Sequence, residues 1–337
     1  MLSKSIIPVI VVFGPTSVGK TDFLLNLSKI SEIINIDSLQ VYKYMNIGTA
    51  KPGAGTLSQI KHHLIDFLDP NEEFNTGDFV HEADKLCFEV FSRDKIPVIS
   101  GGNAFFLINF IKGLPATPKC NPIVRKKVEE ELKNKGIEEL SCKLEKIDPD
   151  YFSKISKNDT YRITRALEIY YSTGKTVSYF KIPEKPRECY NFLFIGLIRE
   201  KEELHERINR RVDLMFENGL YEEFLKLRKM GYGSSSPGMG AIGYKEFFEL
   251  DNEQSVEWQP GDKQLGLDDI KELIKKNTRQ YAKRQITFFK KIDNVIWENP
   301  DNFSAIFHKV EEFLKQHGKI VCNFDNCSFY DKIPIKK

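Results

Sequence analysis

The sequence lacks the features of membrane proteins, disulfide-bonded secreted proteins and repeat proteins. Although 41% of its 337 residues are hydrophobic, no apolar run approaches the roughly 20 residues of a membrane-spanning helix. The six cysteines form no paired framework, which favours a reducing compartment; they stand at positions 87, 120, 142, 189, 322 and 327. Internal repeats and low-complexity tracts are also missing. We therefore expect a cytoplasmic globular protein without a membrane partner, and the length favours two domains.

A complete zinc-binding motif is missing from the C-terminal residues. Cys322 and Cys327 follow His317, but their spacing is not that of a zinc finger and no second histidine follows. We therefore expect no metal finger there. The Lys-rich residues 318–337 predict a poorly ordered tail.

A surplus of positive charge is missing as well, because 50 lysines and arginines face 48 aspartates and glutamates. Only the distribution of charge favours nucleic acid, since seven basic residues and no acidic one lie between Lys275 and Lys291. On a helix, four of these cations share one face: Lys276, Arg279, Lys283 and Lys290. An apolar stripe beside them would dock on the core: Ala282, Ile286 and Phe289. The pattern favours a helix that offers cations to phosphates, with a solvated surface helix as the alternative.

A complete phosphate-binding loop is present near the N-terminus. It follows the β-branched apolar run 6–13 and precedes the helical pattern 22–30; its residues are Gly14, Pro15, Thr16, Ser17, Val18, Gly19, Lys20 and Thr21. Glycines let backbone N–H groups close around phosphate oxygens, Lys20 neutralises them, and the Thr21 hydroxyl binds Mg²⁺. The strand before this loop and the helix after it distinguish it from an ordinary glycine turn. We therefore expect a bound di- or triphosphate, with Mg²⁺ as cofactor.

The carboxylate that usually orders Mg²⁺ in P-loop kinases and ATPases is absent from its expected place. The apolar run 96–100 leads into a glycine pair rather than into an aspartate. A carboxylate instead follows the run 33–36, at Asp37. Because the carboxyl ends of parallel strands face the ligand crevice, we expect Asp37 to lie beside the phosphates. An Asx turn that leaves the strand is the alternative interpretation.

Strand and helix patterns predict an α/β fold with a P-loop NTPase-like core and a helical insertion domain. Six strand-like runs alternate with helical patterns and predict a mostly parallel sheet: 6–13, 33–36, 63–66, 96–100, 191–198 and 294–298. After a proline-rich linker at 114–118, helical periodicity replaces the strand signals. We expect the core to comprise residues 1–114 and 191–317, and the insertion residues 115–190.

Two pairs of arginines stand at helical spacing. Arg207 and Arg211 lie one turn apart on the predicted helix 202–216, so both can face one anion. Arg162 and Arg165 point away from the apolar stripe of the insertion and are available to RNA. Surface pairing with acids such as Glu168 is the alternative for the second pair.

Seven segments together resemble the bacterial tRNA dimethylallyltransferase family, and the resemblance spans about residues 6 to 298. In order, they are GPTSVGKT (14–21), DSLQVYKYMNIGTAKP (37–52), HHLID (62–66), GGNAFF (101–106), NDTYRITRALEIYYSTGKT (158–176), IGYKE (242–246) and QYAKRQITFF (280–289). The segment 37–52 and the letters KRQIT are the most specific, because generic P-loop proteins lack them.

The resemblance implies transfer of a dimethylallyl group from dimethylallyl diphosphate to N6 of the adenosine 3′-adjacent to the tRNA anticodon. Lys20, Arg211 and Mg²⁺ on Thr21 would stabilise the diphosphate that leaves. Asp37 would accept the proton of N6, and the adenine would be flipped out of its stack to reach the site. The partners would be the anticodon stem-loop of tRNA and dimethylallyl diphosphate, and we expect a monomer.

The resemblance also assigns a set of residues to tRNA. They are Asp37, Ser38, Leu39, Gln40, Asn103, Arg125, Tyr161, Arg162, Ile163, Thr164, Arg165, Gly238, Met239, Gly240, Ala241, Ile242, Gly243, Lys283, Arg284, Gln285, Ile286, Thr287, Phe288, Phe289 and Lys290. The sequence departs from the family pattern at Asn103, where Thr is usual, at Phe106, where Tyr is usual, and at Phe288, where Trp is usual. The loop at 238–240 lacks the usual polar side chain. We expect the Asn103 side chain to project into the crevice and to replace the contact of Thr.

Three other functions account for part of the pattern. A P-loop small-molecule kinase would use Asp37 to activate a hydroxyl but would leave the basic helix without a role. A nucleotide-regulated RNA-binding protein without catalysis would need no Asp37. A prenyltransferase acting on free adenine nucleotides would not need the surface that holds the anticodon.

Overall fold

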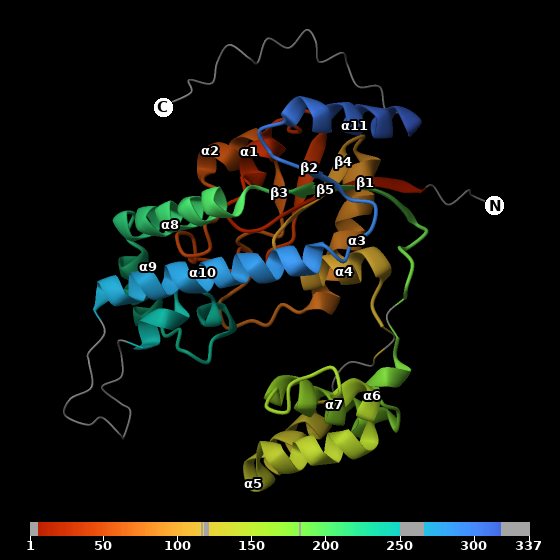
Figure 1. Ribbon diagram of the computed structural model, residues 1–337, viewed down its shortest axis with the longest axis vertical. Helices are drawn as coiled ribbons and strands as arrows, with labels where there is room; N and C mark the ends of the chain where they lie inside the picture. The colour runs from red at the N-terminus through yellow and green to blue at the C-terminus, as the bar shows by residue number, and fades with distance from the viewer. Residues whose placement is uncertain (1–5, 116, 118–120, 182, 250–265, 318–337) are drawn as a thin grey trace. The chain divides into compact units, whose positions relative to one another are not determined.

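The computed structural model describes residues 6–115, 117, 121–181, 183–249 and 266–317. They form two compact units, one running up to Leu107 and again from Glu188 onward, the other from Ile108 to Arg187 (Figure 1). The second unit thus begins before the proline-rich linker at which the sequence predicted the boundary. The expected tail, with Cys322 and Cys327, lies outside the described residues.

A six-stranded sheet organises the first unit, in the order β3-β2-β4-β1-β5-β6. The strands are β1 (Ile7–Phe13), β2 (Ser31–Asn35), β3 (His62–His63), β4 (Ile96–Gly101), β5 (Tyr190–Leu197) and β6 (Ile296–Glu298). Each pair of neighbouring strands is parallel; on β1, for example, Ile10 lies opposite Val98 of β4 and Leu193 of β5. Five of the predicted strands and the α/β class are confirmed, whereas β3 shares only His63 with the predicted run 63–66. The carboxyl ends of β1, β2 and β4 consequently lie at one edge of the sheet.

Three predicted elements are shorter than their sequence patterns, and one of them is β6, which forms only over Ile296–Glu298 of the predicted run 294–298. β3 does not extend through the predicted run 63–66, because Leu64 and Asp66 adopt φ angles of 59° and 58°, in the left-handed region that a strand cannot contain. The helical pattern predicted at 22–30 forms a helix only as far as Leu25, and turns follow it.

The helices of the first unit are α1 (Lys20–Leu25), α2 (Ala54–Gln59), α3 (Thr76–Ser92), α8 (Lys201–Glu217), α9 (Leu220–Lys229), α10 (Leu267–Phe289) and α11 (Phe303–Gln316), with the 3₁₀ helices η2 (Pro237–Gly240) and η3 (Lys245–Glu249). The chain passes into the second unit through α4 (Ala104–Lys112). α8 and α10 pack side by side (Figure 1). Within the described ranges, no helix combines the length and the apolar character needed to cross a membrane.

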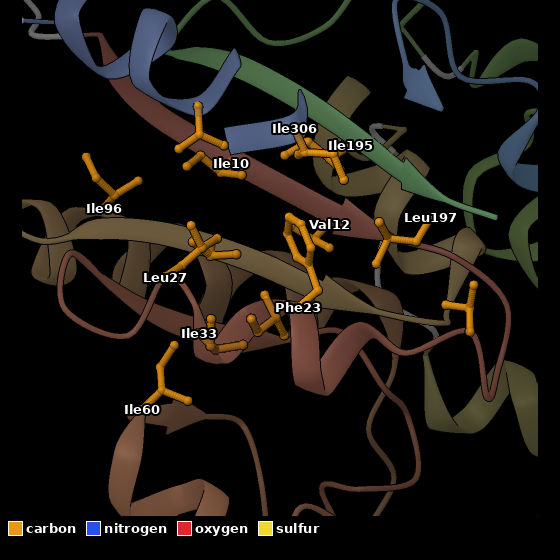
Figure 2. Packing of buried hydrophobic residues seen from close by; sticks show 14 of the residues in the cluster. Ile10, Val12, Phe23, Leu27, Ile33, Ile60, Ile96, Ile195, Leu197 and Ile306 are labelled. Carbon is orange, nitrogen blue, oxygen red and sulfur yellow. The ribbon is translucent and has the colours of Figure 1, made fainter. Parts of the chain in front are cut away.

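The sheet is buried because helices pack on it. Figure 2 shows Ile10 and Val12 of β1 in one cluster with Phe23 of α1 and Ile306 of α11. The intervening residues of β1 point to the other side, and they are fully buried as well. A strand buried on both faces reads as the continuous apolar run from which β1 was predicted.

A second hydrophobic cluster holds the segment that follows β2. Tyr42 and Met45 of this segment are buried among residues of α8, α9 and α10. Tyr244 and Phe247 complete the cluster and are fully buried. The segment with the sequence DSLQVYKYMNIGTAKP is therefore packed into the core rather than left as an open loop.

The second unit consists of helices and has a small core of its own. It contains α5 (Pro122–Ile147), α6 (Pro149–Phe152), α7 (Thr160–Thr173) and the 3₁₀ helix η1 (Val177–Tyr179). α5 changes direction at Gly136, whose φ of 77° favours glycine. The predicted apolar stripe of α7 packs against α5, with Ile163, Ala166 and Leu167 buried.

Candidate active site

A cavity of about 460 Å³ opens at the carboxyl edge of the sheet, where the loops after β1, β2 and β4 meet. These loops contribute Thr16 to Asp22, Asp37 with Gln40, and Gly101 with Gly102. α8 and α10 also contribute to the wall, with Arg211 and Gln285 respectively. The predicted meeting of the phosphate loop with Asp37 is thus observed.

The phosphate loop has the shape of an anion-binding nest. Ser17 and Gly19 adopt φ angles of 64° and 108°, and α1 begins directly after Gly19, at Lys20. Such left-handed residues turn successive backbone N–H groups toward one concave surface. The loop can therefore surround phosphate oxygens with backbone donors, as its sequence predicted.

Lys20 points back over this loop. Its Nζ donates to the carbonyl oxygens of Gly14 and Pro15, both at 2.9 Å. Burial in the cavity lowers the pKa of Lys20 to about 7; Arg211 lowers it too, and Asp37 opposes the shift. A bound phosphate anion would favour the ammonium form, so charge on the ligand and charge on Lys20 are coupled.

Arginines of α8 approach the loop from the other side. Arg211 Nη1 donates to the Thr16 hydroxyl at 3.2 Å, and Arg207 Nε donates to the Ser17 carbonyl at 2.9 Å. Both side chains line the cavity, as their one-turn spacing predicted. Burial lowers the pKa of Arg211 from its ordinary value, while Asp37 raises it. An arginine remains charged despite such a shift, so the cavity holds a permanent cation beside the nest.

Asp37 both lies in the cavity and forms an Asx turn, which were the two interpretations of its sequence position. Its carboxylate lines the cavity, and Oδ1 also accepts from the backbone N–H groups of Leu39 at 2.9 Å and Gln40 at 3.3 Å. This Asx turn fixes the direction of the carboxylate. Of the four neighbouring residues assigned to the target base, Asp37 and Gln40 line the cavity, whereas Ser38 and Leu39 do not.

Gln40 braces the segment that follows it. Its Nε2 donates to the carbonyl oxygens of Thr49, at 3.1 Å, and Ala50, at 3.2 Å. Because Thr49 and Ala50 also line the cavity, one side chain holds together two stretches of the same wall.

A carboxylate clamps the same segment from α9. Glu223 accepts from the backbone N–H groups of Asn46, Ile47 and Gly48 at 3.0 to 3.1 Å. The Tyr244 hydroxyl donates to Glu223 at 2.6 Å, and burial raises the pKa of Tyr244 far above its ordinary value. A side chain at Gly48 would collide with the Tyr244 ring, since an added Cβ would lie 2.5 Å from it. Tyr244, which belongs to the motif IGYKE, therefore helps to fix the segment 37–52 in place.

Comparisons with known proteins identify the family. The model of the IPP transferase family matches residues 40–292. A tRNA dimethylallyltransferase of Acetivibrio thermocellus is 42% identical over 320 residues, covering 92% of this chain and 98% of that protein. One of Borrelia turicatae is 42% identical over 295 residues, covering 87% and 95%. The chain belongs to the tRNA dimethylallyltransferase family.

Solved structures of this family share the fold. The full-length tRNA isopentenylpyrophosphate transferase of Bacillus halodurans superposes with a TM-score of 0.65 at 33% identity, covering 93% of this chain and 98% of that one. A eukaryotic dimethylallyltransferase acting on tRNA gives a TM-score of 0.74 at 27% identity, covering 94% and 81%. The resemblance seen in the sequence is confirmed.

The residues of α10 that the resemblance assigned to tRNA divide between two faces of the helix. Those exposed to solvent are Lys283, Arg284, Thr287, Phe288 and Lys290. Those turned to the core are Gln285, Ile286 and Phe289. Of the four cations predicted to share one face, Lys276, Lys283 and Lys290 are exposed, whereas Arg279 is half-buried and donates to Asn209. Only the outer face of α10 can therefore offer side chains to a partner.

The expected position of Asn103 is wrong. Its side-chain oxygen accepts from the backbone N–H of Phe106 at 3.1 Å, at the start of α4, and Asn103 does not line the cavity. An asparagine that precedes a helix commonly satisfies one of the free N–H groups of the first turn. The side chain thus caps α4 instead of projecting into the crevice.

The turn at 238–243 is mostly buried. Gly238, Met239, Ala241 and Gly243 are buried, Ile242 is half-buried and only Gly240 is exposed. Gly243 N–H donates to Glu246 at 2.8 Å, so this turn supports the fold around Tyr244. A partner can reach it only through Gly240, Ile242 and their backbone.

In the second unit, the arginines assigned to tRNA form ion pairs. Arg162 pairs with Asp159 at 2.7 Å and Arg165 with Glu168 at 3.0 Å, while Arg125 lies 3.7 Å from Glu168. Arg125 and Arg162 keep about half of their side-chain surface exposed. Of the other assigned residues, Tyr161 is exposed, Thr164 is half-buried and Ile163 is buried. The surface pairing with acids, which was the alternative to RNA binding, is therefore present. Arg125 and Arg162 still face solvent within their pairs.

Sequence reasoning missed several residues that shape the cavity. Arg199 Nε donates to the Val18 carbonyl at 2.9 Å, and its guanidinium pairs with Asp301 at 2.6 Å. Tyr281 lines the cavity, and burial raises its pKa, with Asp37 contributing to the shift. Helical spacing would have placed Tyr281 one turn before Gln285 on the inner face of α10. The local pair of Arg199 with Glu203 did not reveal this role, because its partners Val18 and Asp301 are distant in the sequence.

Proposed function

We propose that this protein transfers the dimethylallyl group of dimethylallyl diphosphate to N6 of the adenosine 3′-adjacent to the tRNA anticodon. The observation that carries this proposal is one cavity that combines a phosphate-binding nest and cations with the carboxylate Asp37, whereas β4 has no carboxylate. Such a cavity can hold a diphosphate and deprotonate an acceptor. Membership of the tRNA dimethylallyltransferase family specifies the acceptor.

The first part of the chemistry is departure of the diphosphate. The bond between C1 of the dimethylallyl group and the diphosphate oxygen breaks, and its electron pair goes to the diphosphate. Negative charge therefore grows on the leaving group, where Lys20, Arg207 and Arg211 surround the nest. Donors fixed in place before the reaction stabilise such a transition state without reorganisation.

The second part is attack by adenine N6. A new bond forms between N6 and C1, and N6 must lose one proton. Asp37 is the base that would accept it, because its carboxylate lies in the cavity and its direction is set by the Asx turn. An adenine stacked in an anticodon loop would have to be flipped out to reach this carboxylate.

Mg²⁺ would accompany the diphosphate. Among the described residues, no cluster of three or more His, Cys, Asp or Glu side chains could hold a metal ion by itself. Mg²⁺ commonly keeps water and phosphate ligands and needs only one or two protein oxygens. Thr21, which lines the cavity beside Lys20, would supply such an oxygen. Bound there, Mg²⁺ would neutralise charge on the diphosphate.

The tRNA would contact the outer face of α10, where Lys283, Arg284 and Lys290 are exposed beside Phe288. Cations bind phosphates and aromatic rings stack on unpaired bases, which is the usual combination for RNA loops. In the second unit, Arg125, Tyr161 and Arg162 are the exposed candidates. We also propose a monomer that acts in the cytoplasm.

The decisive experiment is incubation of the protein with labelled dimethylallyl diphosphate and Mg²⁺, with tRNA, AMP and ATP offered as separate acceptors. We expect label in tRNA, at N6 of the adenosine 3′-adjacent to the anticodon, and none in the nucleotides. Label in AMP or ATP alone would show a prenyltransferase of free nucleotides. Phosphate transfer from ATP to a small molecule would show a kinase.

A further inference from the structure

Gln285 is a buried glutamine that bridges two loops of the cavity. It lies on the inner face of α10 and is only 4% exposed. Its Oε1 accepts from the backbone N–H of Thr16 at 2.9 Å, and its Nε2 donates to the carbonyl of Gly102 at 2.8 Å. One side chain therefore joins the phosphate loop after β1 to the loop after β4.

The bridge needs both ends of an amide. A buried N–H or C=O without a partner costs stability, so each end of Gln285 is matched to one backbone group. Leucine would satisfy neither group, and glutamate could accept from Thr16 but could not donate to Gly102. Gly102 leaves no space for a side chain here, because an added Cβ would lie 2.3 Å from Gln285 Nε2.

The Thr16 N–H that Gln285 binds is turned toward α10. The Thr16 hydroxyl accepts from Arg211. The backbone N–H of Thr16 is therefore held by α10 and its hydroxyl by α8. Thr16 is followed by Ser17, which has the left-handed conformation that shapes the nest. Any displacement of Gln285 would therefore change the start of this nest and the position of Arg211.

α10 also carries exposed cations next to Gln285. Lys283 and Arg284 precede it in the sequence and face solvent. With RNA bound on its outer face, α10 would connect the RNA to the phosphate loop through Gln285. If both sites favour the same position of the helix, each ligand strengthens the binding of the other by the same factor.

We propose that Gln285 is a positioning residue that holds the phosphate loop in its anion-binding shape and links that loop to α10. Through this link, RNA on the outer face of α10 and diphosphate in the cavity bind cooperatively. The cooperative part rests on the proposed function. The effect on the phosphate loop does not, because it concerns diphosphate alone.

The test measures binding of inorganic diphosphate with Mg²⁺ by calorimetry, with and without an anticodon stem-loop RNA. For Gln285→Leu we expect diphosphate to bind about 10-fold more weakly and the RNA to lose its effect on diphosphate affinity, because two hydrogen bonds are removed. Gln285→Glu keeps the acceptor but loses the donor to Gly102 and places a negative charge beside the anion site, so it should weaken binding at least as much. Gln280→Leu is the matched control, since Gln280 is an exposed glutamine of the same helix.

Gly102→Ala tests the bridge without changing Gln285, in case Gln285→Leu does not fold. Its methyl group should displace the amide and weaken diphosphate binding in the same direction, with thermal unfolding as the check on folding. Diphosphate affinity equal to that of the wild type in the folded variants would overturn the positioning role. Weaker diphosphate binding with an unchanged effect of RNA would overturn the link. Absence of prenyl transfer by the wild type would refute the proposed function and leave the diphosphate result valid.

Discussion

At the scale of single residues, different side chains of the cavity stabilise the leaving diphosphate and accept the proton, because one polar group cannot do both. Lys20 and Arg211 supply positive charge to a leaving diphosphate, whereas Asp37 must accept a proton in the same space. Opposite charges nearby stabilise one another, and Asp37 raises the pKa values of both cations. Because the carboxylate itself accepts the proton, its loss should affect proton transfer first and diphosphate binding less.

We predict that Asp37→Asn lowers kcat by about 10²-fold or more, because an amide can orient N6 but cannot accept its proton. The variant should still bind tRNA and inorganic diphosphate. Asparagine can also form the Asx turn, so the loop should keep its shape. Single-turnover prenyl transfer measures the effect, and a rate near that of the wild type would remove Asp37 from the mechanism.

Lys20 should make diphosphate binding depend on pH. Its pKa in the free protein is about 7, so above this pH the amine is mostly neutral and must take up a proton when the anion binds. The association constant should therefore fall as pH rises from 7, until the higher pKa of the complex is passed. Calorimetry across this range should give a steeper fall for the wild type than for Lys20→Arg, whose guanidinium stays charged. Because diphosphate titrates equally with both proteins, equal slopes would contradict the prediction.

At the scale of elements, periodicity predicted which face of α10 is apolar but not what its polar inner residue does. Ala282 and Phe289 are buried as the stripe required. Gln285 lies on the same inner face, yet its partners Thr16 and Gly102 are distant in the sequence, and no local pattern reveals such contacts. Most of the strands were predictable for the opposite reason, since they are short apolar runs that local composition reveals, whereas β3 is the dipeptide His62–His63.

The outer face of α10 should act through phosphates. We predict that Lys283→Ala weakens binding of all tRNAs alike and lowers the slope of log K against log salt by about one unit, because one phosphate contact is lost. Lys309→Ala, which removes an exposed lysine from α11, is the matched control. Binding titrations between low and moderate salt measure both. An unchanged slope for Lys283→Ala would show that this face is only solvated.

The cap of α4 leads to a different expectation from the one that the sequence suggested for Asn103. Its side-chain oxygen accepts from the Phe106 N–H, so Asn103→Ala should lower the free energy of unfolding by about 1 kcal/mol. Asn103→Asp keeps an acceptor and should retain most of that stability. Denaturant unfolding measures both variants. Unchanged stability together with a raised KM for tRNA would show that Asn103 contacts tRNA instead of stabilising α4.

At the scale of the whole molecule, sequence reasoning predicted a sheet-based core and a helical insertion, and both kinds of unit are present. The boundary was predicted at the proline-rich linker, although α4 already carries the chain out of the first unit. Proline marks where regular structure ends, whereas contacts decide where a compact unit ends. Contacts between distant segments also create an ion cluster that no spacing rule identifies.

This cluster should make the stability of the whole molecule depend on acid. Glu32 of β2 is nearly buried and pairs with His63 of β3 and Arg93 after α3. Burial alone would raise the pKa of Glu32, but hydrogen bonds from Arg93 and His63 outweigh it and lower the pKa to about 2. A carboxylate with a depressed pKa stabilises the fold above its unfolded pKa of roughly 4.3 and loses this contribution as pH falls toward 2.

We therefore predict that the free energy of unfolding of the wild type decreases between about pH 4.5 and pH 2, with Glu32 accounting for on the order of 2 kcal/mol of the loss. Glu32→Gln should be less stable at pH 7, because Arg93 loses its ionic partner, and its stability should fall less in acid. Denaturant unfolding at a series of pH values measures both curves. Parallel curves for the two proteins would show that other carboxylates, not Glu32, carry the acid sensitivity of the fold.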